Sequence, residues 1–124
     1  MMNAIKLPFP ARELQPNARV HYLTKSRFTK RARHDAFWAT KDSGLKIKGS
    51  GEIFITLIFR PPNNRPRDRD NLMAACKAYA DGIADALKVN DSRFRFNPVV
   101  IEAPEKNGST FIVVTEQVLE VSEV

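Results

Sequence analysis

The chain has 124 residues, of which 43% are hydrophobic and 27% charged, and its formal net charge is +6. This length predicts one domain, and the apolar content is enough for a packed core, which excludes wholesale disorder. No apolar run approaches the ~18 residues that a membrane-spanning helix needs, and the N-terminus lacks the apolar segment of a signal peptide. We therefore expect a cytoplasmic protein with no membrane partner.

The positive charge is concentrated in the first part of the chain. Residues 1–50 hold eleven Lys or Arg and three Asp or Glu, a balance of +8, whereas residues 51–124 hold nine and eleven, a balance of −2. A basic half beside a near-neutral half is typical of a protein that binds nucleic acid or another polyanion. A solvated surface that keeps the protein soluble explains the charge equally well.

The first half of the chain predicts a short edge strand and a long helix. The segment 5–10 favours an edge strand because prolines end it. From about Tyr22 to Lys41, apolar residues recur at helical spacing, and Asp42-Ser43-Gly44 is a typical helix end. Basic residues lie at the other positions of this helix and just before it, where they could contact a phosphate backbone: Arg19, Lys25, Arg27, Lys30, Arg31 and Arg33. Each of them could equally belong to a solvated face.

The second half predicts a strand, a helix and two further strands. Residues 52–60 are nearly all apolar, which favours a central strand buried on both faces. Residues 70–88 have the apolar spacing of a second helix, and in that helix Cys76 is expected to be a small core residue. Residues 94–101 and 110–116 read as strands joined through Asn107-Gly108, which favours an antiparallel hairpin. We therefore predict one small α+β domain over residues 1–116, a mixed sheet packed by two helices, followed by an acidic tail, 117–124.

Two carboxylates separated by one residue, Asp68 and Asp70, lie between the predicted central strand and the second helix. Arg65, Arg67 and Arg69 alternate with them. Closely spaced carboxylates suit a hard cation such as Mg²⁺, which completes its shell with water and substrate phosphate. Guanidinium groups present paired donors that suit the phosphate itself. A helix cap is the purely structural explanation, and it accounts for one of the two carboxylates.

Further polar residues extend this pattern along the second helix. Helical periodicity places Lys77 and Asp81 on the face of Asp70, and an ordinary ion pair between them is the structural alternative. Asp91 follows the helix, near this site or near the same site of another copy. Three carboxylates and a lysine would suit phosphodiester hydrolysis, in which the metal activates water and the lysine stabilises developing negative charge.

The segments Arg67-Asp68-Arg69-Asp70-Asn71-Leu72, Lys77-x-x-x-Asp81 and Asn90-Asp91-Ser92 resemble the RusA family of Holliday junction resolvases, often carried by prophages. Leu7-Pro8-Phe9-Pro10 and Pro16-Asn17-Ala18-Arg19 also resemble that family's N-terminal signature, and the resemblance covers the chain to about Glu116. It implies a RusA-like fold and a homodimeric endonuclease that cuts four-way DNA junctions symmetrically. It also implies Mg²⁺ as the cofactor, with Mn²⁺ as an alternative. Asp68, Asp70 and Asp91 would be the metal-binding catalytic carboxylates and Lys77 the catalytic lysine.

The sequence departs from that family at two places. The founding member has its lysine four residues after the second aspartate, where this chain has Ala74, so Lys77 would have to replace it from one helical turn further on. The family often has two adjacent acids at the distal position, and here the first is Asn90.

Two other hypotheses compete with the junction endonuclease. One is a basic nucleic-acid-binding protein without catalysis, in which the aspartates only cap and pair. The other is a different metal enzyme with an Asp-x-Asp motif that acts on a nucleotide, which the short chain and the lack of a glycine-rich phosphate loop disfavour.

Overall fold

The computed structural model describes residues 3–116, so the predicted tail 117–124 lies outside the described residues. The elements are, in chain order, β1 (Asn3–Leu7), the 3₁₀ turn η1 (Arg12–Leu14), α1 (Tyr22–Ser43), β2 (Ile53–Arg60), α2 (Arg69–Ala75), α3 (Lys77–Leu87), the 3₁₀ turn η2 (Asp91–Arg93), β3 (Phe94–Phe96), β4 (Val100–Ile101) and β5 (Ser109–Glu116). They form one small α+β domain with a mixed sheet, as predicted.

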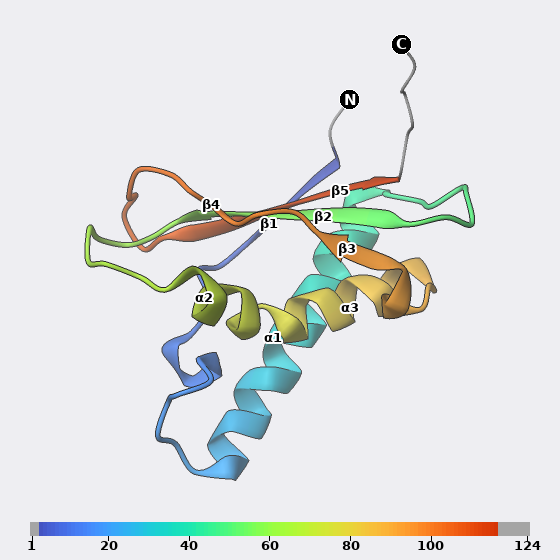
Figure 1. The fold of residues 1–124 in the computed structure, drawn as a ribbon. Helices are drawn as coiled ribbons and strands as arrows, with labels where there is room; N and C mark the ends of the chain where they lie inside the picture. The colour runs from blue at the N-terminus through green and yellow to red at the C-terminus, as the bar shows by residue number, and fades with distance from the viewer. Residues whose placement is uncertain (1–2, 117–124) are drawn as a thin grey trace.

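The sheet has the order β1-β5-β2-β3, and β4 also pairs with β2. The central position of β2 is confirmed, but only alternate residues, such as Ile53 and Phe59, are buried, and the residues between them are half-buried. The reason is that all three helices cover the same face of the sheet (Figure 1). The prediction of burial on both faces is therefore wrong. β1 lies at the opposite edge from β3 and β4, which confirms the predicted edge strand with different bounds.

The predicted strand 94–101 is two short strands, β3 and β4, which both run parallel to β2. Asn97 continues the ladder, because its backbone N–H donates to the Ile55 carbonyl at 2.9 Å. Pro98 follows, and it has no N–H to donate, so the regular ladder is interrupted before Val100.

The predicted hairpin between residues 94–101 and 110–116 is wrong. Asn107 and Gly108 do form a tight turn, with φ of 67° and 70°. However, β5 pairs antiparallel with β2 and β1, while β4 lies on the other side of β2. The connection therefore crosses the end of β2. A local turn signal does not reveal which strand the following segment joins.

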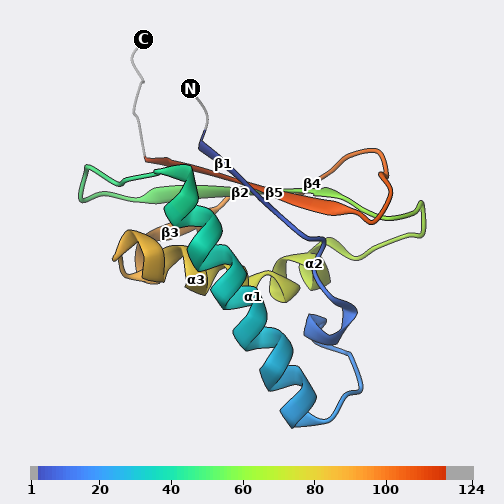
Figure 2. The same ribbon diagram turned by 180° about the vertical axis from the view of Figure 1, so that it is seen from behind.

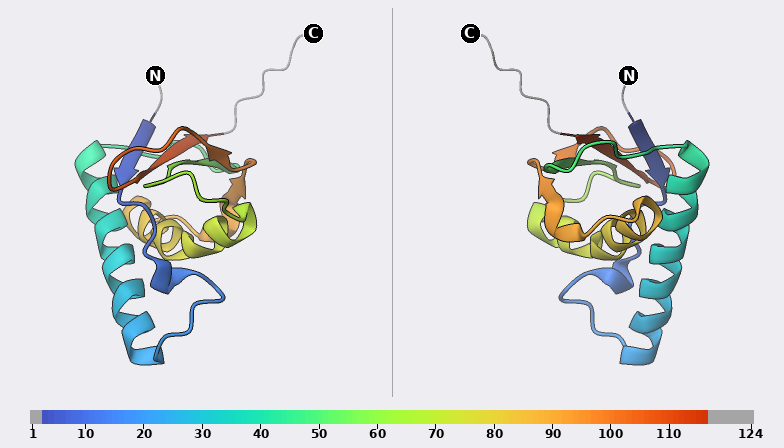
Figure 3. Two further views of the ribbon diagram at one scale, coloured as in Figure 1. Left: turned by 90° about the vertical axis from the view of Figure 1, so that its left-hand side faces the viewer. Right: turned by 90° about the vertical axis from the view of Figure 1, so that its right-hand side faces the viewer.

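The long first helix is confirmed as α1. His21 caps its N-terminus, where Nδ1 accepts from the Leu23 N–H at 3.2 Å, and Gly44 ends it in the left-handed region with φ of 74°. Ala32 and Ala36 are buried, and the C-terminal half of α1 packs across α3 (Figure 2). The start of α1 extends beyond the sheet and the other two helices (Figure 3).

The predicted second helix is interrupted at Cys76, so the sheet is covered by three helices and not by two. Cys76 has φ of −94° and ψ of 5°, and its N–H donates to the Met73 carbonyl, which ends α2 just before α3 begins. The sequence does not show this break, because the apolar spacing is the same on both sides of it. As predicted, Cys76 lies in the core, and burial raises the pKa of its thiol. None of the helices in residues 3–116 combines the length and the apolar content that a bilayer crossing requires.

Candidate functional site

Asp68 and Asp70 lie where the chain leaves β2 and enters α2. Asp68 is the N-cap of α2, and its Oδ1 accepts from the Asn71 N–H at 3.1 Å. Asp70 lies in the first turn, where a carboxylate favours the helix dipole. Both residues are exposed, and no cationic side chain of residues 3–116 forms an ion pair with either of them. The cap therefore explains one oxygen of Asp68 and leaves the other three carboxylate oxygens of the pair without a partner from this part of the chain.

The neighbouring arginines do not neutralise this pair. Two of them, Arg67 and Arg69, donate hydrogen bonds to backbone carbonyls instead. Arg67 donates to the Asn63 and Arg65 carbonyls and to the Asn63 side chain, and its guanidinium lies 5.3 Å from the centre of the Phe9 ring. Arg69 donates from Nη1 to the Val99 carbonyl at 2.6 Å. Of the three predicted phosphate-binding arginines, Arg65 is the one whose side chain makes no hydrogen bond within the described residues.

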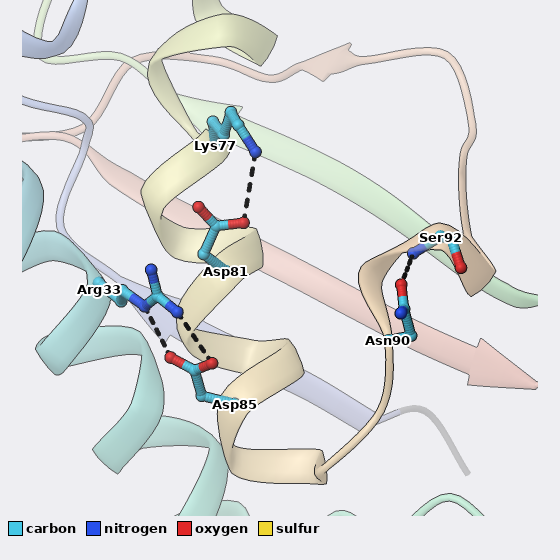
Figure 4. Close-up of polar contacts among 6 residues, drawn as sticks. All are labelled: Arg33, Lys77, Asp81, Asp85, Asn90 and Ser92. Atoms are coloured by element: carbon cyan, nitrogen blue, oxygen red, sulfur yellow. Dashed lines mark hydrogen bonds and ion pairs between the residues drawn. The ribbon is translucent and has the colours of Figure 1, made fainter.

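Asp91 lies at the far end of the helix pair. It opens η2, and the preceding Asn90 caps that turn, with Oδ1 accepting from the Ser92 N–H at 2.8 Å (Figure 4). The seven residues of α2 and the eleven of α3 lie between it and Asp68, a helical path of about 27 Å at about 1.5 Å per residue. One chain therefore does not bring the three aspartates together. In residues 3–116 no three His, Cys, Asp or Glu side chains are grouped closely enough to hold a metal ion.

Lys77 is the first residue of α3. Its Nζ is 3.4 Å from Asp81 Oδ1 (Figure 4), and the predicted ion pair is present, with the lysine side chain 75% exposed and the aspartate 24%. Both residues line a groove of about 290 Å³ between α1 and α3, opposite Lys25 and Thr29. Ala74 also lines this groove and Asp70 does not, so the groove starts one turn beyond the carboxylate pair.

The predicted basic face of α1 divides into two parts. Arg33 is held by α3, because its Nε and Nη2 donate to the two carboxylate oxygens of Asp85 at 2.6 and 3.0 Å (Figure 4). This contact was not predictable, since the two residues are 52 positions apart and neither has a local signal. The other predicted contacts lie nearer the projecting end of the helix or just before it, where all but the half-buried Lys25 are exposed: Arg19, Lys25, Arg27, Lys30 and Arg31. Thr29 was missed, although it lies one helical turn after Lys25 and so lines the same groove.

Comparison with known sequences gives one informative match. An "Uncharacterized protein" of Xylella fastidiosa (strain Temecula1 / ATCC 700964) is 37% identical over 117 residues, which are 92% of this chain and 76% of that protein. No family model matches the chain. At this identity and coverage, the chain belongs to the same protein family as the Xylella fastidiosa protein.

Proposed function

We propose that this protein is a Mg²⁺-dependent endodeoxyribonuclease that resolves four-way DNA junctions by symmetric phosphodiester hydrolysis, as a homodimer in the cytoplasm of a bacterial or phage-infected cell. The observation that carries the proposal is the pair of exposed, unneutralised carboxylates at the start of α2. In a chain of net charge +6, carboxylates left without a cationic partner beside three arginines are suited to an added cation.

The donor set fits magnesium. Neither carboxylate oxygen of Asp70 takes part in a hydrogen bond or an ion pair among the described residues, and Asp68 keeps Oδ2 while Oδ1 accepts from Asn71. Mg²⁺ prefers such oxygen ligands, usually takes one or two carboxylates and leaves positions for water and phosphate, and Mn²⁺ accepts the same set. Once bound, the metal would lower the pKa of a water molecule and offset the charge that develops on the phosphate.

Asp91 supports a dimeric enzyme. It and the Asp68/Asp70 pair lie at opposite ends of one sheet edge, because Arg69 anchors the start of α2 to Val99, just before β4, and Asp91 opens the turn that leads into β3. If two copies met at that edge around a two-fold axis, the edge strands of the second copy would run in the opposite direction. Asp91 of the partner subunit would then lie toward Asp68 and Asp70. Phe96 and Val100, exposed along the same edge, would lie in the contact. Two such sites would match the two strands that resolution requires.

The remaining residues have complementary roles in this proposal. Lys77 would place a compact positive charge beside the phosphate that is cut. Arg65 and the free donors of Arg67 and Arg69 would contact the phosphates on either side, while the exposed cations of α1 would hold a neighbouring arm of the DNA.

The decisive experiment is a cleavage gel with synthetic four-way, flap and linear duplex substrates, with and without Mg²⁺. We expect paired symmetric cuts in the four-way junction with metal only. Asp70→Asn and Asp91→Asn should each bind the junction and fail to cut. Cleavage by Asp70→Asn at the wild-type rate would refute the site.

Mixing inactive variants tests whether the site is shared between subunits. A heterodimer of Asp70→Asn and Asp91→Asn contains one intact shared site, so the mixture should nick one strand of the junction. The matched control is a mixture of Asp68→Asn and Asp70→Asn, whose heterodimer has no intact site and should remain inactive. If both mixtures are inactive while each variant still forms dimers, the carboxylates do not act across the interface.

A non-catalytic nucleic-acid-binding protein is the second candidate, and the run of cations without acids on α1 favours it. In that case the same gel would show retarded DNA without cleavage under every metal condition.

A further inference from the structure

The start of α1 exposes apolar and basic side chains, although the segment also contacts η1 and lines the groove beside α3. α1 is about 33 Å long at about 1.5 Å for each of its 22 residues, and its buried residues begin at the eleventh position, with Ala32, Ala36 and Thr40. The start of α1 projects beyond the sheet and the other helices (Figures 1 and 3). Two large apolar side chains are exposed at the tip, Tyr22 by 73% and Leu23 by 55%.

The charge of this projecting segment favours a polyanion. From His21 to His34 the sequence has five Lys or Arg and no Asp or Glu, and one of the five, Arg33, is paired with Asp85. The helix dipole adds positive potential at the same end. A two-fold contact of this segment with its own copy would bring like charges together, which disfavours a second copy as the occupant.

The aromatic group at the tip is already held in place. His21 and Tyr22 are stacked, with ring centres 4.7 Å apart and planes 27° from parallel. The His21 ring is fixed because its Nδ1 accepts from the Leu23 N–H, which is also the N-cap of the helix. Ordering an aromatic side chain in advance lowers the entropic cost of stacking a ligand on it. Behind it, Arg27, Phe28, Lys30 and Arg31 line a hollow of about 480 Å³ along the helix.

We propose that Tyr22, supported by His21, is a stacking platform for an unpaired or unstacked base of a branched nucleic acid, with the cations of α1 holding the phosphates beside it. Aromatic side chains and basic residues together form the usual site for single-stranded nucleotides, because every base has a face that can stack. This inference rests on the proposed function only for its substrate class, branched DNA. It would make the protein prefer a branch point, where bases unstack at low cost, over an intact duplex.

The test is a binding titration of the full chain with a four-way junction that carries 2-aminopurine at the branch point, in EDTA so that no metal-dependent cleavage occurs. Wild-type protein should quench the probe when the base stacks on Tyr22. Tyr22→Ala should abolish the quench and weaken junction affinity by roughly 5- to 100-fold, the usual effect of removing one stacking side chain. Affinity for linear duplex should change by less than about twofold, and Tyr22→Phe should retain both quench and affinity.

Two further variants separate stacking from helix stability. His21→Asn keeps a good N-cap but removes the ring, so helicity should be unchanged and junction affinity should fall by less than in Tyr22→Ala. Trp38→Ala removes another exposed aromatic side chain of the same helix, 51% exposed and more than four turns away, and should bind the junction as the wild type does.

Three results would overturn the proposal that Tyr22 stacks on a base. Tyr22→Ala could lose equal affinity for junction and duplex, it could lose no affinity, or it could sediment as a smaller species than the wild type. The last result would mean that Tyr22 contacts a second copy. The outcome is independent of catalysis. If the protein never cuts with Mg²⁺ but quenches the probe through Tyr22, the stacking proposal stands and the nuclease proposal fails. If the protein cuts and Tyr22→Ala binds junctions normally, the nuclease proposal stands and the stacking proposal fails.

Discussion

Arg33 and Asp85 join α1 to α3 through two parallel hydrogen bonds, Nε to Oδ2 at 2.6 Å and Nη2 to Oδ1 at 3.0 Å. The hydrogen bonds and the opposite charge lower the pKa of Asp85 and raise the pKa of Arg33. One turn before Asp85, Gly82 lies against the backbone of Arg33, so the ion pair is located beside a close approach of the two helices.

Gly82→Ala should destabilise the protein by about 1–3 kcal/mol. A β-carbon at residue 82 would collide with the Arg33 carbonyl oxygen and lie 3.0 Å from the Ala36 β-carbon, and neither group is the end of a flexible side chain. Overpacking typically costs about 1–3 kcal/mol and occasionally more, and here the collision is with rigid backbone. The net loss therefore stays in this range after the ~1 kcal/mol that alanine contributes in a helix is subtracted. Urea unfolding measures the change.

Gly51→Ala is the matched control, because a β-carbon there meets nothing within 4 Å and Gly51 has no left-handed φ. It should leave the free energy of unfolding within ~0.5 kcal/mol of the wild type. If Gly82→Ala is equally neutral, the helices separate more easily than their contact indicates.

The Arg33–Asp85 pair should contribute less than ~1 kcal/mol, because the two side chains are 51% and 42% exposed and solvent screens them. A double-mutant cycle with Arg33→Ala and Asp85→Ala measures the coupling energy. Because the folded pKa of Asp85 is depressed, the coupling should be present at pH 7 and disappear as the pH falls through that pKa, below the ordinary value near 3.8. A coupling energy that stays the same while the Asp85 carboxyl becomes protonated would contradict an ionic origin.

The sequence was sufficient where a local pattern decides the structure. The capping role of one aspartate, the end of α1 at Gly44 and the core position of Cys76 all follow from spacing and side-chain chemistry. The strand partners of β5 and the pairing of Arg33 with Asp85 were not accessible, because both depend on segments far apart in the chain. For the same reason, the i+2 spacing of Asp68 and Asp70 indicates a common location, whereas the place of Asp91 depends on the length of two intervening helices.

Glu116 should hold the loop before β2 in a pH-dependent manner. Its carboxylate accepts from the backbone N–H groups of Lys48 and Gly49 at 2.8 and 2.5 Å, and these bonds lower the pKa of Glu116 below its ordinary value of 4.5. The contribution to stability is therefore fully present above pH 4.5 and is lost as the pH falls through the lower folded pKa. Hydrogen exchange should show both amides protected at neutral pH. In Glu116→Gln the protection should be weaker and should no longer change across the acidic range, and identical exchange in the two proteins would refute the role.

Binding to any duplex should weaken steeply with salt, with a slope of about −0.9 in log K against log[salt] for each phosphate neutralised on B-DNA. Replacing Lys30 and Arg31 together by alanine should flatten that slope by up to about 2. Arg33→Ala should change it less, because this guanidinium is already paired with Asp85. A slope that is the same in all three proteins would mean that the helix is solvated and does not contact DNA.

Lys77 has two possible roles, a structural ion pair and a catalytic charge. It pairs with Asp81, and it also lines a groove together with Lys25. If the lysine stabilises the transition state, Lys77→Ala should lower the cleavage rate at saturating junction by roughly 10²–10³, the range for losing one such donor. Junction affinity should change little, because one phosphate contact is a small part of the total. Lys77→Arg should restore little of the rate, since a planar guanidinium does not reproduce a compact ammonium charge.

Asp81→Asn separates this role from the ion pair. It removes the partner of Lys77 but leaves the lysine, so a catalytic lysine predicts a cleavage rate near that of the wild type in this variant. The pair itself is exposed on the lysine side and 3.4 Å long, so either substitution should cost less than ~1 kcal/mol of stability. Single-turnover reactions started with Mg²⁺ measure the rates without product release. A rate within threefold of the wild type for Lys77→Ala would assign the lysine to the ion pair alone, and the chemistry would then depend on the carboxylates and the metal they hold.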